Sequence, residues 1–307
     1  MSTPTLAPII RSAKSVCSLS PSALRTHLIA GPSRATPLHL PDLISDWPAL
    51  KTWSLSDHMK AVRDGVGENK SVEVELGKKG RGYLHKEWQR VWMPFGLFLD
   101  AFILNLVPSS SPSEELPTAY LAQSDILDSS PNLLEAIPVL PHFYEGKEKS
   151  LYRRTMWIGP KGSFTPFHKD PYHGIYSQIV GKKTFHILPP GAVPHLDISS
   201  LPRHTNTSQI PLPVSRIYSS PSSPTSTTST SPPVGPTTST SNTLDDLSDL
   251  PHAIVQTWRT KLDAAFDMPG ACQVTLEAGE SVLVPEGWWH AAEGVDGSGV
   301  GVNAWFR

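Results

Sequence analysis

The sequence predicts a mainly β fold, a barrel or sandwich whose strands come from two distant parts of the chain. Short apolar or alternating runs, separated by glycine and proline turns, fill residues 151–190. Similar runs return at 274–306, beyond a spacer made largely of Ser, Thr and Pro. Strands on both sides of one spacer indicate a single β structure that two halves of the chain close together.

The individual elements follow from the spacing of apolar residues. Before residue 151 we expect strands at 38–40, 71–76 and 119–122 and helices at 42–53, 95–106 and 132–137. After it we expect a turn at Gly181-Lys182 and strands at 155–158, 175–180, 183–188, 274–276, 281–284 and 300–306. Two helical segments, 244–250 and 254–266, return the chain to order after the spacer.

The composition excludes several classes of protein. The chain has 307 residues, a net charge of −2 and a pI of about 6.6, so it carries no global basic field for nucleic acid. Its two cysteines, Cys17 and Cys272, exclude a disulfide scaffold and a thiolate zinc cluster, and they favour a reducing compartment. No run reaches the roughly 18 to 20 apolar residues of a membrane span, and we expect no secretory leader.

The chain divides into two unequal parts. Residues 1–37 form a basic segment without Asp or Glu, which fits either a transit peptide or a mildly basic lead into the fold. Residues 38–307 form the predicted domain. Within it, 21 of the 24 residues at 219–242 are Ser, Thr or Pro and none is charged, so we expect a disordered insertion at about 205–243.

The first candidate for chemistry is the pair His168 and Asp170. Residues two apart in a strand project to the same face, so an imidazole and a carboxylate can occupy adjacent positions on a metal. Two histidines and one carboxylate that leave three sites open are the ligand set of non-haem Fe(II) oxygenases. His290, which follows a predicted buried strand and two tryptophans, is either a packed core residue or the third ligand.

The second candidate is Lys183, at the head of the apolar strand 183–188. Alternation places its side chain with Phe185 and Ile187 on one face. If that face is the barrel interior, the ammonium needs an anion, and a dicarboxylate cosubstrate would supply one. The alternative is that Lys182 and Lys183 are two solvated hairpin lysines.

Four segments together resemble the JmjC-type, cupin-fold oxygenases that depend on Fe(II) and 2-oxoglutarate. They are AYLAQ at 119–123, WIGP at 157–160, TPFHKD at 165–170 and QIVGKK at 178–183. Their order and spacing are most similar to the small JmjC hydroxylases, the group that contains lysine-specific demethylase 8 and the hypoxia-factor asparaginyl hydroxylase. The resemblance implies a double-stranded β-helix, or jelly-roll, barrel with flanking N-terminal helices.

The resemblance also implies roles for individual residues. His168, Asp170 and His290 would bind iron, and Lys183 would pair with the distal carboxylate of 2-oxoglutarate. The other implied cosubstrate or substrate contacts are Thr165, Tyr120, Gln123, Trp157 and Asn303. The chain departs from the family pattern at Gly174, where the family usually has an Asn that supports the cosubstrate; His173 and Asn303 are the candidate replacements.

The implied reaction oxidises a C–H bond while 2-oxoglutarate and O2 become succinate and CO2. Hydroxylation of a protein or peptide side chain is the first expectation, histone lysine demethylation through N-methyl hydroxylation the second, and RNA base hydroxylation the third. Two other classes stay open: a metal cupin that does not use 2-oxoglutarate, for which Lys183 is dispensable, and an inactive binding scaffold. We expect an intracellular protein, nuclear or cytoplasmic, with mitochondria as the alternative that the acid-free start allows.

Overall fold

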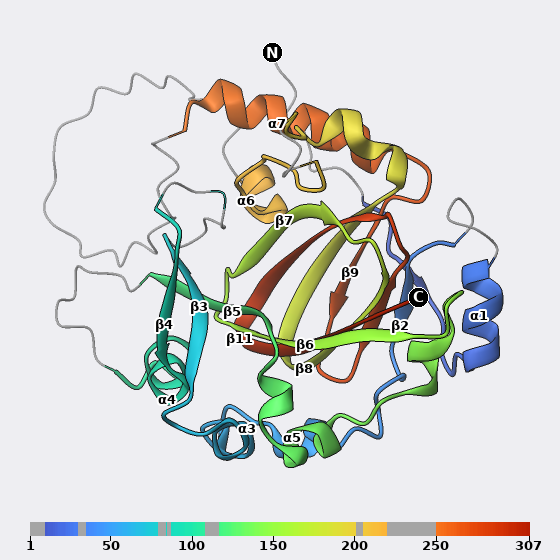
Figure 1. The fold of residues 1–307 in the computed structure, drawn as a ribbon. Helices are drawn as coiled ribbons and strands as arrows, with labels where there is room; N and C mark the ends of the chain where they lie inside the picture. The colour runs from blue at the N-terminus through green and yellow to red at the C-terminus, as the bar shows by residue number, and fades with distance from the viewer. Residues whose placement is uncertain are drawn as a thin grey trace, which may run out of the picture.

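Long bent strands wrap around a central space and are flanked by short helices (Figure 1). The structure is a computed structural model that describes residues 10–29, 35–78, 84, 87–107, 117–200, 205–219 and 250–307. Within these residues eleven strands join in the order β1-β2-β10-β8-β11-β6-β5-β3-β4, with β7 on β11 and β9 on β8. Their bounds are β1 Lys14–Ser15, β2 Leu38–Leu40, β3 Ser71–Gly77, β4 Gln89–Pro94, β5 Thr118–Ser124, β6 Leu151–Gly159, β7 Phe164–Lys169, β8 His173–Leu188, β9 Cys272–Leu276, β10 Ser281–Val284 and β11 Trp289–Phe306.

Strands β8 and β11 hold the barrel together. They run antiparallel along almost their whole length, from Trp289 opposite Leu188 to Phe306 opposite His173. Strand β11 also pairs with β7 and β6, so it connects the segments on the two sides of the Ser/Thr/Pro spacer. The predicted jelly-roll barrel, closed by distant halves of the chain, is therefore confirmed.

The predicted turn at Gly181-Lys182 is wrong, because β8 continues through it as one bent strand. Gly181 has a φ of +72°, a conformation that favours glycine, and the register with β11 shifts nearby. A Cβ at Gly181 would lie 2.5 Å from the backbone oxygen of Ser298. The bend therefore depends on glycine for both its backbone conformation and its close approach to β11.

Gly181→Ala should lower the free energy of unfolding by about 2 to 3 kcal/mol, because strain from positive φ adds to the steric overlap. Denaturant unfolding measures the change. Gly162→Ala is the matched control: Gly162 has a φ of +82°, but apart from its chain neighbours no atom of the described residues lies within 4 Å of its added Cβ, so only the conformational cost applies. Equal losses in the two variants would contradict the steric part of this explanation.

Short helices flank the barrel, mostly from the N-terminal half of the chain. Helix 95–106 is observed as an α-helical turn that continues into a π-helical turn, Leu99–Ile103. In the predicted helix 42–53 only the last turn is helical. Strand β4 was not predicted, because its mixed sequence shows no clear alternation of apolar and polar residues. The α-helices are α1 Pro21–Ile29, α2 Ala49–Thr52, α3 Lys60–Val66, α4 Phe95–Phe98, α5 Pro131–Ala136, α6 Val214–Ser219 and α7 His252–Phe266.

The ordered domain begins before residue 38. Strand β1 pairs with β2, and helix α1 buries Leu24 and Leu28 in the core beside the barrel. The Arg25 guanidinium lies 2.6 Å from the Glu145 carboxylate, a contact between α1 and the rest of the domain. The predicted boundary at 38 therefore needs correction, since apolar residues of α1 find partners in the fold. Residues 1–9 and 30–34 lie outside the described residues.

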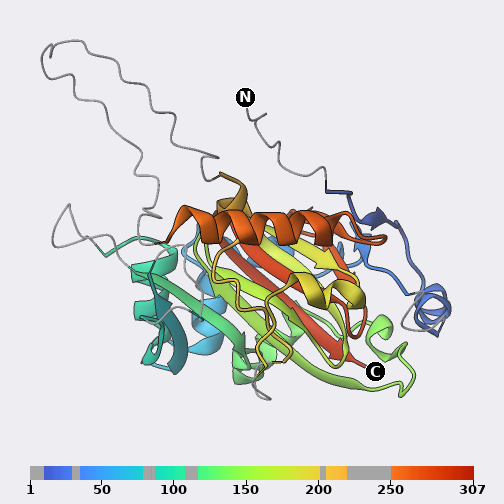
Figure 2. The same ribbon diagram turned by 90° about the horizontal axis from the view of Figure 1, so that it is seen from above.

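The insertion also starts later than about 205. Residues 205–219 are described, and Ile210, Leu212 and Ile217 are buried in a cluster with residues of α7, the long helix that crosses the barrel in Figure 2. Their aliphatic side chains give this stretch the apolar surface that 219–242 lacks. Residues 220–249, including most of the predicted helix 244–250, lie outside the described residues. None of the described helices is long and apolar enough to cross a membrane.

Candidate active site

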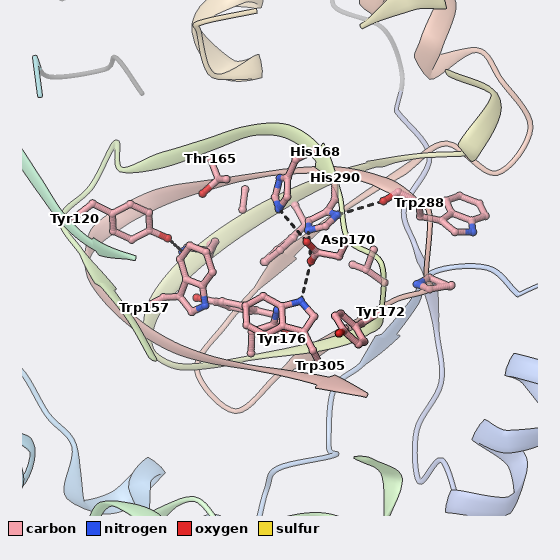
Figure 3. A pocket seen from close by; sticks show the side chains of 17 residues that line it. Tyr120, Trp157, Thr165, His168, Asp170, Tyr172, Tyr176, Trp288, His290 and Trp305 are labelled. Carbon is pink, nitrogen blue, oxygen red and sulfur yellow. Dashed lines mark hydrogen bonds and ion pairs between the residues drawn. The ribbon is translucent and has the colours of Figure 1, made fainter. Parts of the chain in front are cut away.

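His168, Asp170 and His290 meet at one end of the barrel interior (Figure 3). His168 lies on β7 directly opposite His290 on β11, and Asp170 follows the end of β7. The Asp170 carboxylate oxygens lie 4.0 Å from His168 Nε2 and 3.8 Å from His290 Nε2. One ligand atom from each residue lies within 4.8 Å of the others. Antiparallel pairing of β7 and β11 thus brings the two halves of the predicted ligand set together.

Neighbouring groups orient the three side chains toward a common centre. His168 Nδ1 lies 2.9 Å from the Pro166 carbonyl oxygen and His290 Nδ1 lies 3.4 Å from that of Trp288. If each Nδ1–H donates to its carbonyl, each Nε2 lone pair is free for a metal. The Trp305 indole N–H donates to the Asp170 carboxylate over 2.8 Å.

The charge states also suit a divalent metal. Burial lowers the pKa of His290 to about 4, so this imidazole is neutral at pH 7. Burial works against ionisation of Asp170, but the two imidazoles and the Trp305 hydrogen bond outweigh it and hold the pKa of the carboxyl below its ordinary value. Two imidazole nitrogens and one carboxylate oxygen are the donor set that fits Fe(II) with open positions.

An inner pocket extends from this centre to Lys183, on β8. The Lys183 side chain is buried, and its Nζ donates to the Tyr120 hydroxyl over 2.9 Å. Thr165 lines the same pocket as Tyr120 and acts against the rise that burial causes in the pKa of its hydroxyl. Burial lowers the pKa of Lys183 to about 7, and no carboxylate of the described residues pairs with it. Its neighbour Lys182 is the surface lysine and lies 3.0 Å from Glu277. A buried ammonium with no anion beside it suits a dicarboxylate ligand.

Asn303 lines the same pocket from β11. Its side chain is buried, and its Oδ1 has no hydrogen-bond partner among the residues that the structure describes. A Cβ built on Gly174 would lie 3.5 Å from that Oδ1, so the two positions face each other. His173, the other candidate replacement, instead accepts a hydrogen bond from the Glu286 N–H over 3.0 Å. Only Asn303 of the two is placed to meet a ligand in the pocket.

An outer cavity of about 370 Å³ leads from the surface to His168 and Asp170. Trp157 and Thr165 line both this cavity and the inner pocket. Gln123 is exposed and lines the outer cavity but not the inner pocket, so the structure places it at the entrance, on the substrate side, and its assignment as a cosubstrate contact is corrected. It has a φ of +50° and lies in an irregular part of the β5–β6 pairing.

Two residues of the entrance were not recognised from the sequence. Glu75 of β3 lies opposite Tyr120 of β5, and burial raises its pKa to about 7. Trp88, beside the start of β4, lines the same cavity as Glu75. Alternation gave Glu75 a solvent-facing position, and only the pairing of β3 with β5 shows that this face continues the barrel interior.

The jelly-roll barrel with a His-Asp-His centre at one end defines the JmjC, cupin-fold class of dioxygenases, which use Fe(II) and 2-oxoglutarate. Comparison with known families agrees. Residues 31–307 match the family described as "Cupin-like domain", and the chain belongs to that family.

Curated relatives carry JmjC names. The chain is 33% identical over 189 residues to lysine-specific demethylase JMJ30 of Arabidopsis thaliana, covering 62% of this chain and 40% of that protein. It is 32% identical to lysine-specific demethylase 8 of Xenopus tropicalis over 48% of this chain and 30% of that protein. Lysine-specific demethylase JMJ32 of Arabidopsis thaliana is 26% identical over 89% of this chain and 76% of its own length. The first two matches thus span less than half of those relatives.

Proposed function

We propose that the protein is an Fe(II)- and 2-oxoglutarate-dependent oxygenase that hydroxylates a cationic side chain of a protein substrate. His168, Asp170 and His290 would hold the iron, and Lys183 with Tyr120 and Thr165 would hold the distal carboxylate of 2-oxoglutarate. With O2 as the oxidant, iron and 2-oxoglutarate would supply oxidation of a C–H bond: one oxygen atom enters the substrate as a hydroxyl group and the other enters succinate, with release of CO2. Two observations support this fit: within the described part of the chain, the buried Lys183 has no carboxylate partner and the Asn303 Oδ1 has no hydrogen-bond partner.

The lining of the outer cavity is the observation that supports a cationic substrate. Glu75 contributes a carboxylate near the entrance and Trp157 contributes an aromatic face, while the Arg90 guanidinium lies over the Trp88 ring, 5.4 Å from its centroid. A carboxylate beside aromatic faces favours a cation through charge and cation–π attraction. Arg90 lies on the same wall, opposite Glu75 and 3.9 Å from Glu73, so its charge acts on both carboxylates. Glu75 is the more buried of the two carboxylates, and it is the acidic group that we assign to the oxidised side chain.

Each part of the cavity lining would have its own role in substrate binding. Glu75 would orient the cation, Trp157 would separate the cosubstrate end from the substrate end, and the buried pocket around Lys183 would exclude water. A Lys or Arg side chain that enters the outer cavity brings its C–H bonds into the space that Glu75 shares with His168 and Asp170. Its N–H groups can donate to Glu75, which a fully methylated ammonium cannot do.

Lysine demethylation is the second candidate, and the names of the curated relatives favour it. The two reactions differ in product. Hydroxylation adds one oxygen atom to the substrate and keeps its carbon skeleton, whereas demethylation removes a methyl group as formaldehyde. Mass spectrometry of Lys-, methyl-Lys- and Arg-containing peptides, alongside succinate formation, distinguishes the two.

Glu75→Gln should lower kcat/KM for a cationic peptide by about 10- to 100-fold, because a charged hydrogen bond becomes a neutral one. With Glu75 present, kcat/KM should rise as the pH increases through about 7, since deprotonation creates the carboxylate that binds the cation. The variant should lose this step in the pH profile.

The matched control is Glu135→Gln, which removes the same charge from an exposed site on α5. It should leave kcat/KM and its pH profile unchanged. Equal activity of the Glu75→Gln variant on cationic peptides would contradict the assigned substrate class.

A further inference from the structure

A surface groove of about 600 Å³ continues the outer cavity along the sheet. The two share Glu73, Ala122 and Gln123, so they adjoin at these residues. Beyond these residues the groove is lined by Trp92 of β4 and by Asp125, Asp128, Lys70 and Arg153. The Trp92 side chain is 67% exposed, an unusual position for so large an apolar group.

The register of β3 and β4 gives the entrance and the groove a regular spacing. Glu75 lies opposite Arg90, and Glu73 lies opposite Trp92. Residues two apart on a strand share a face and lie about 7 Å from each other along it. The Glu73–Trp92 pair is therefore one step further from the metal centre than the Glu75–Arg90 pair, on the same face of the sheet.

We infer that this groove binds the substrate chain beside the oxidised residue and selects a Lys or Arg two positions away from it. This inference rests on the proposed function. An extended polypeptide has the same two-residue period as the sheet, so one side chain can reach Glu75 while the next on that face reaches Trp92 and Glu73. An aromatic face beside a carboxylate favours a cationic side chain.

The charges of the groove support a basic peptide. Three carboxylates, Glu73, Asp125 and Asp128, face two cations, Lys70 and Arg153. Arg153 lies 3.2 Å from Asp125, and Arg90 lies only within 3.9 Å of Glu73. The Glu73 carboxylate, which is 42% exposed, therefore keeps room for a second cation.

The test uses the full chain and a set of seven-residue alanine peptides with a central Arg and Lys, Ala or Glu two positions before or after it. Dissociation constants are measured by calorimetry with 2-oxoglutarate and a redox-inert divalent metal present. Lys at one of the two positions should tighten binding by about 3- to 10-fold over Ala, and Glu should weaken it.

The gain from Lys should disappear in Trp92→Ala, persist in Trp92→Phe and shrink in Glu73→Gln. Tyr144→Ala, which removes an aromatic ring that is 41% exposed and absent from the groove lining, should keep it. Circular dichroism confirms that each variant is folded.

Three results would overturn the inference and leave the proposed function intact. The first is peptide binding that depends on Glu75 but is the same for Lys, Ala and Glu at both flanking positions. The second is a gain from Lys that survives Trp92→Ala. The third is self-association that Trp92→Ala abolishes, which would make the groove a contact between copies of the chain. A peptide dissociation constant that Glu75→Gln leaves unchanged would instead contradict the proposed function itself.

Discussion

Asp170→Ala is expected to abolish succinate formation from 2-oxoglutarate and to weaken divalent metal binding by at least about 100-fold. Asp170 supplies the only negative charge among the three candidate ligands, and both histidines lie within 4.0 Å of it. Without the carboxylate, two neutral imidazoles would hold a dication with two donors and no compensating charge. Purified protein with Fe(II), ascorbate and 2-oxoglutarate measures turnover, and calorimetry with Co(II) measures metal binding.

The control for this substitution is Asp46→Ala, which removes an exposed carboxylate outside the site. It should retain both metal binding and turnover. Asp170→Ala should stay folded, because Asp170 is a partly exposed side chain whose direct hydrogen-bond partner among the described residues is the Trp305 indole. Metal affinity that survives Asp170→Ala in folded protein would place the metal elsewhere.

The local part of the site was predictable from the sequence, and the long-range part depended on strand pairing. His168 and Asp170 are two residues apart, so a strand alone places them on one face. His290 is joined to them only by the β7–β11 register, which a resemblance could suggest but periodicity could not. Lys183 followed from alternation, because its face of β8 is the barrel interior even though the turn before it is absent.

The entrance and the ends of the domain were not predictable for a related reason. Glu75 and Trp92 occupy polar or irregular strand positions whose meaning depends on β3 lying beside β5. Helix α1 and residues 205–219 have modest apolar content, and their order comes from docking on a core that other segments build. Tertiary packing thus decided every correction to the predicted boundaries.

The residue that separates a 2-oxoglutarate oxygenase from other metal cupins is Lys183. Lys183→Met keeps the length of the side chain and removes its charge, and we expect the affinity for 2-oxoglutarate to fall by about 100-fold or more, while metal binding stays intact.

The charge of Lys183 also predicts that the affinity for 2-oxoglutarate depends on pH. In the protein without cosubstrate, burial lowers the pKa of Lys183 to about 7, whereas a bound dicarboxylate would favour the ammonium form. Above pH 7 binding should therefore take up a proton, and affinity should fall as the pH rises.

Calorimetry in two buffers of different ionisation enthalpy at pH 8 measures this proton uptake directly. Lys182→Met is the matched control, because the Lys182 ammonium lies at the surface beside Glu277, so its loss should affect neither affinity nor proton uptake.

Unchanged 2-oxoglutarate affinity in Lys183→Met would favour a cupin that uses its metal without this cosubstrate. If the unmodified chain binds metal but not 2-oxoglutarate, the result would favour an inactive scaffold. Its physical cause would then be Gly174, which stands where the family usually has an Asn that supports the cosubstrate. Proton uptake that disappears only in Lys183→Met would instead tie the buried ammonium to the cosubstrate, because Asn303 and Tyr120 carry no charge at that pH.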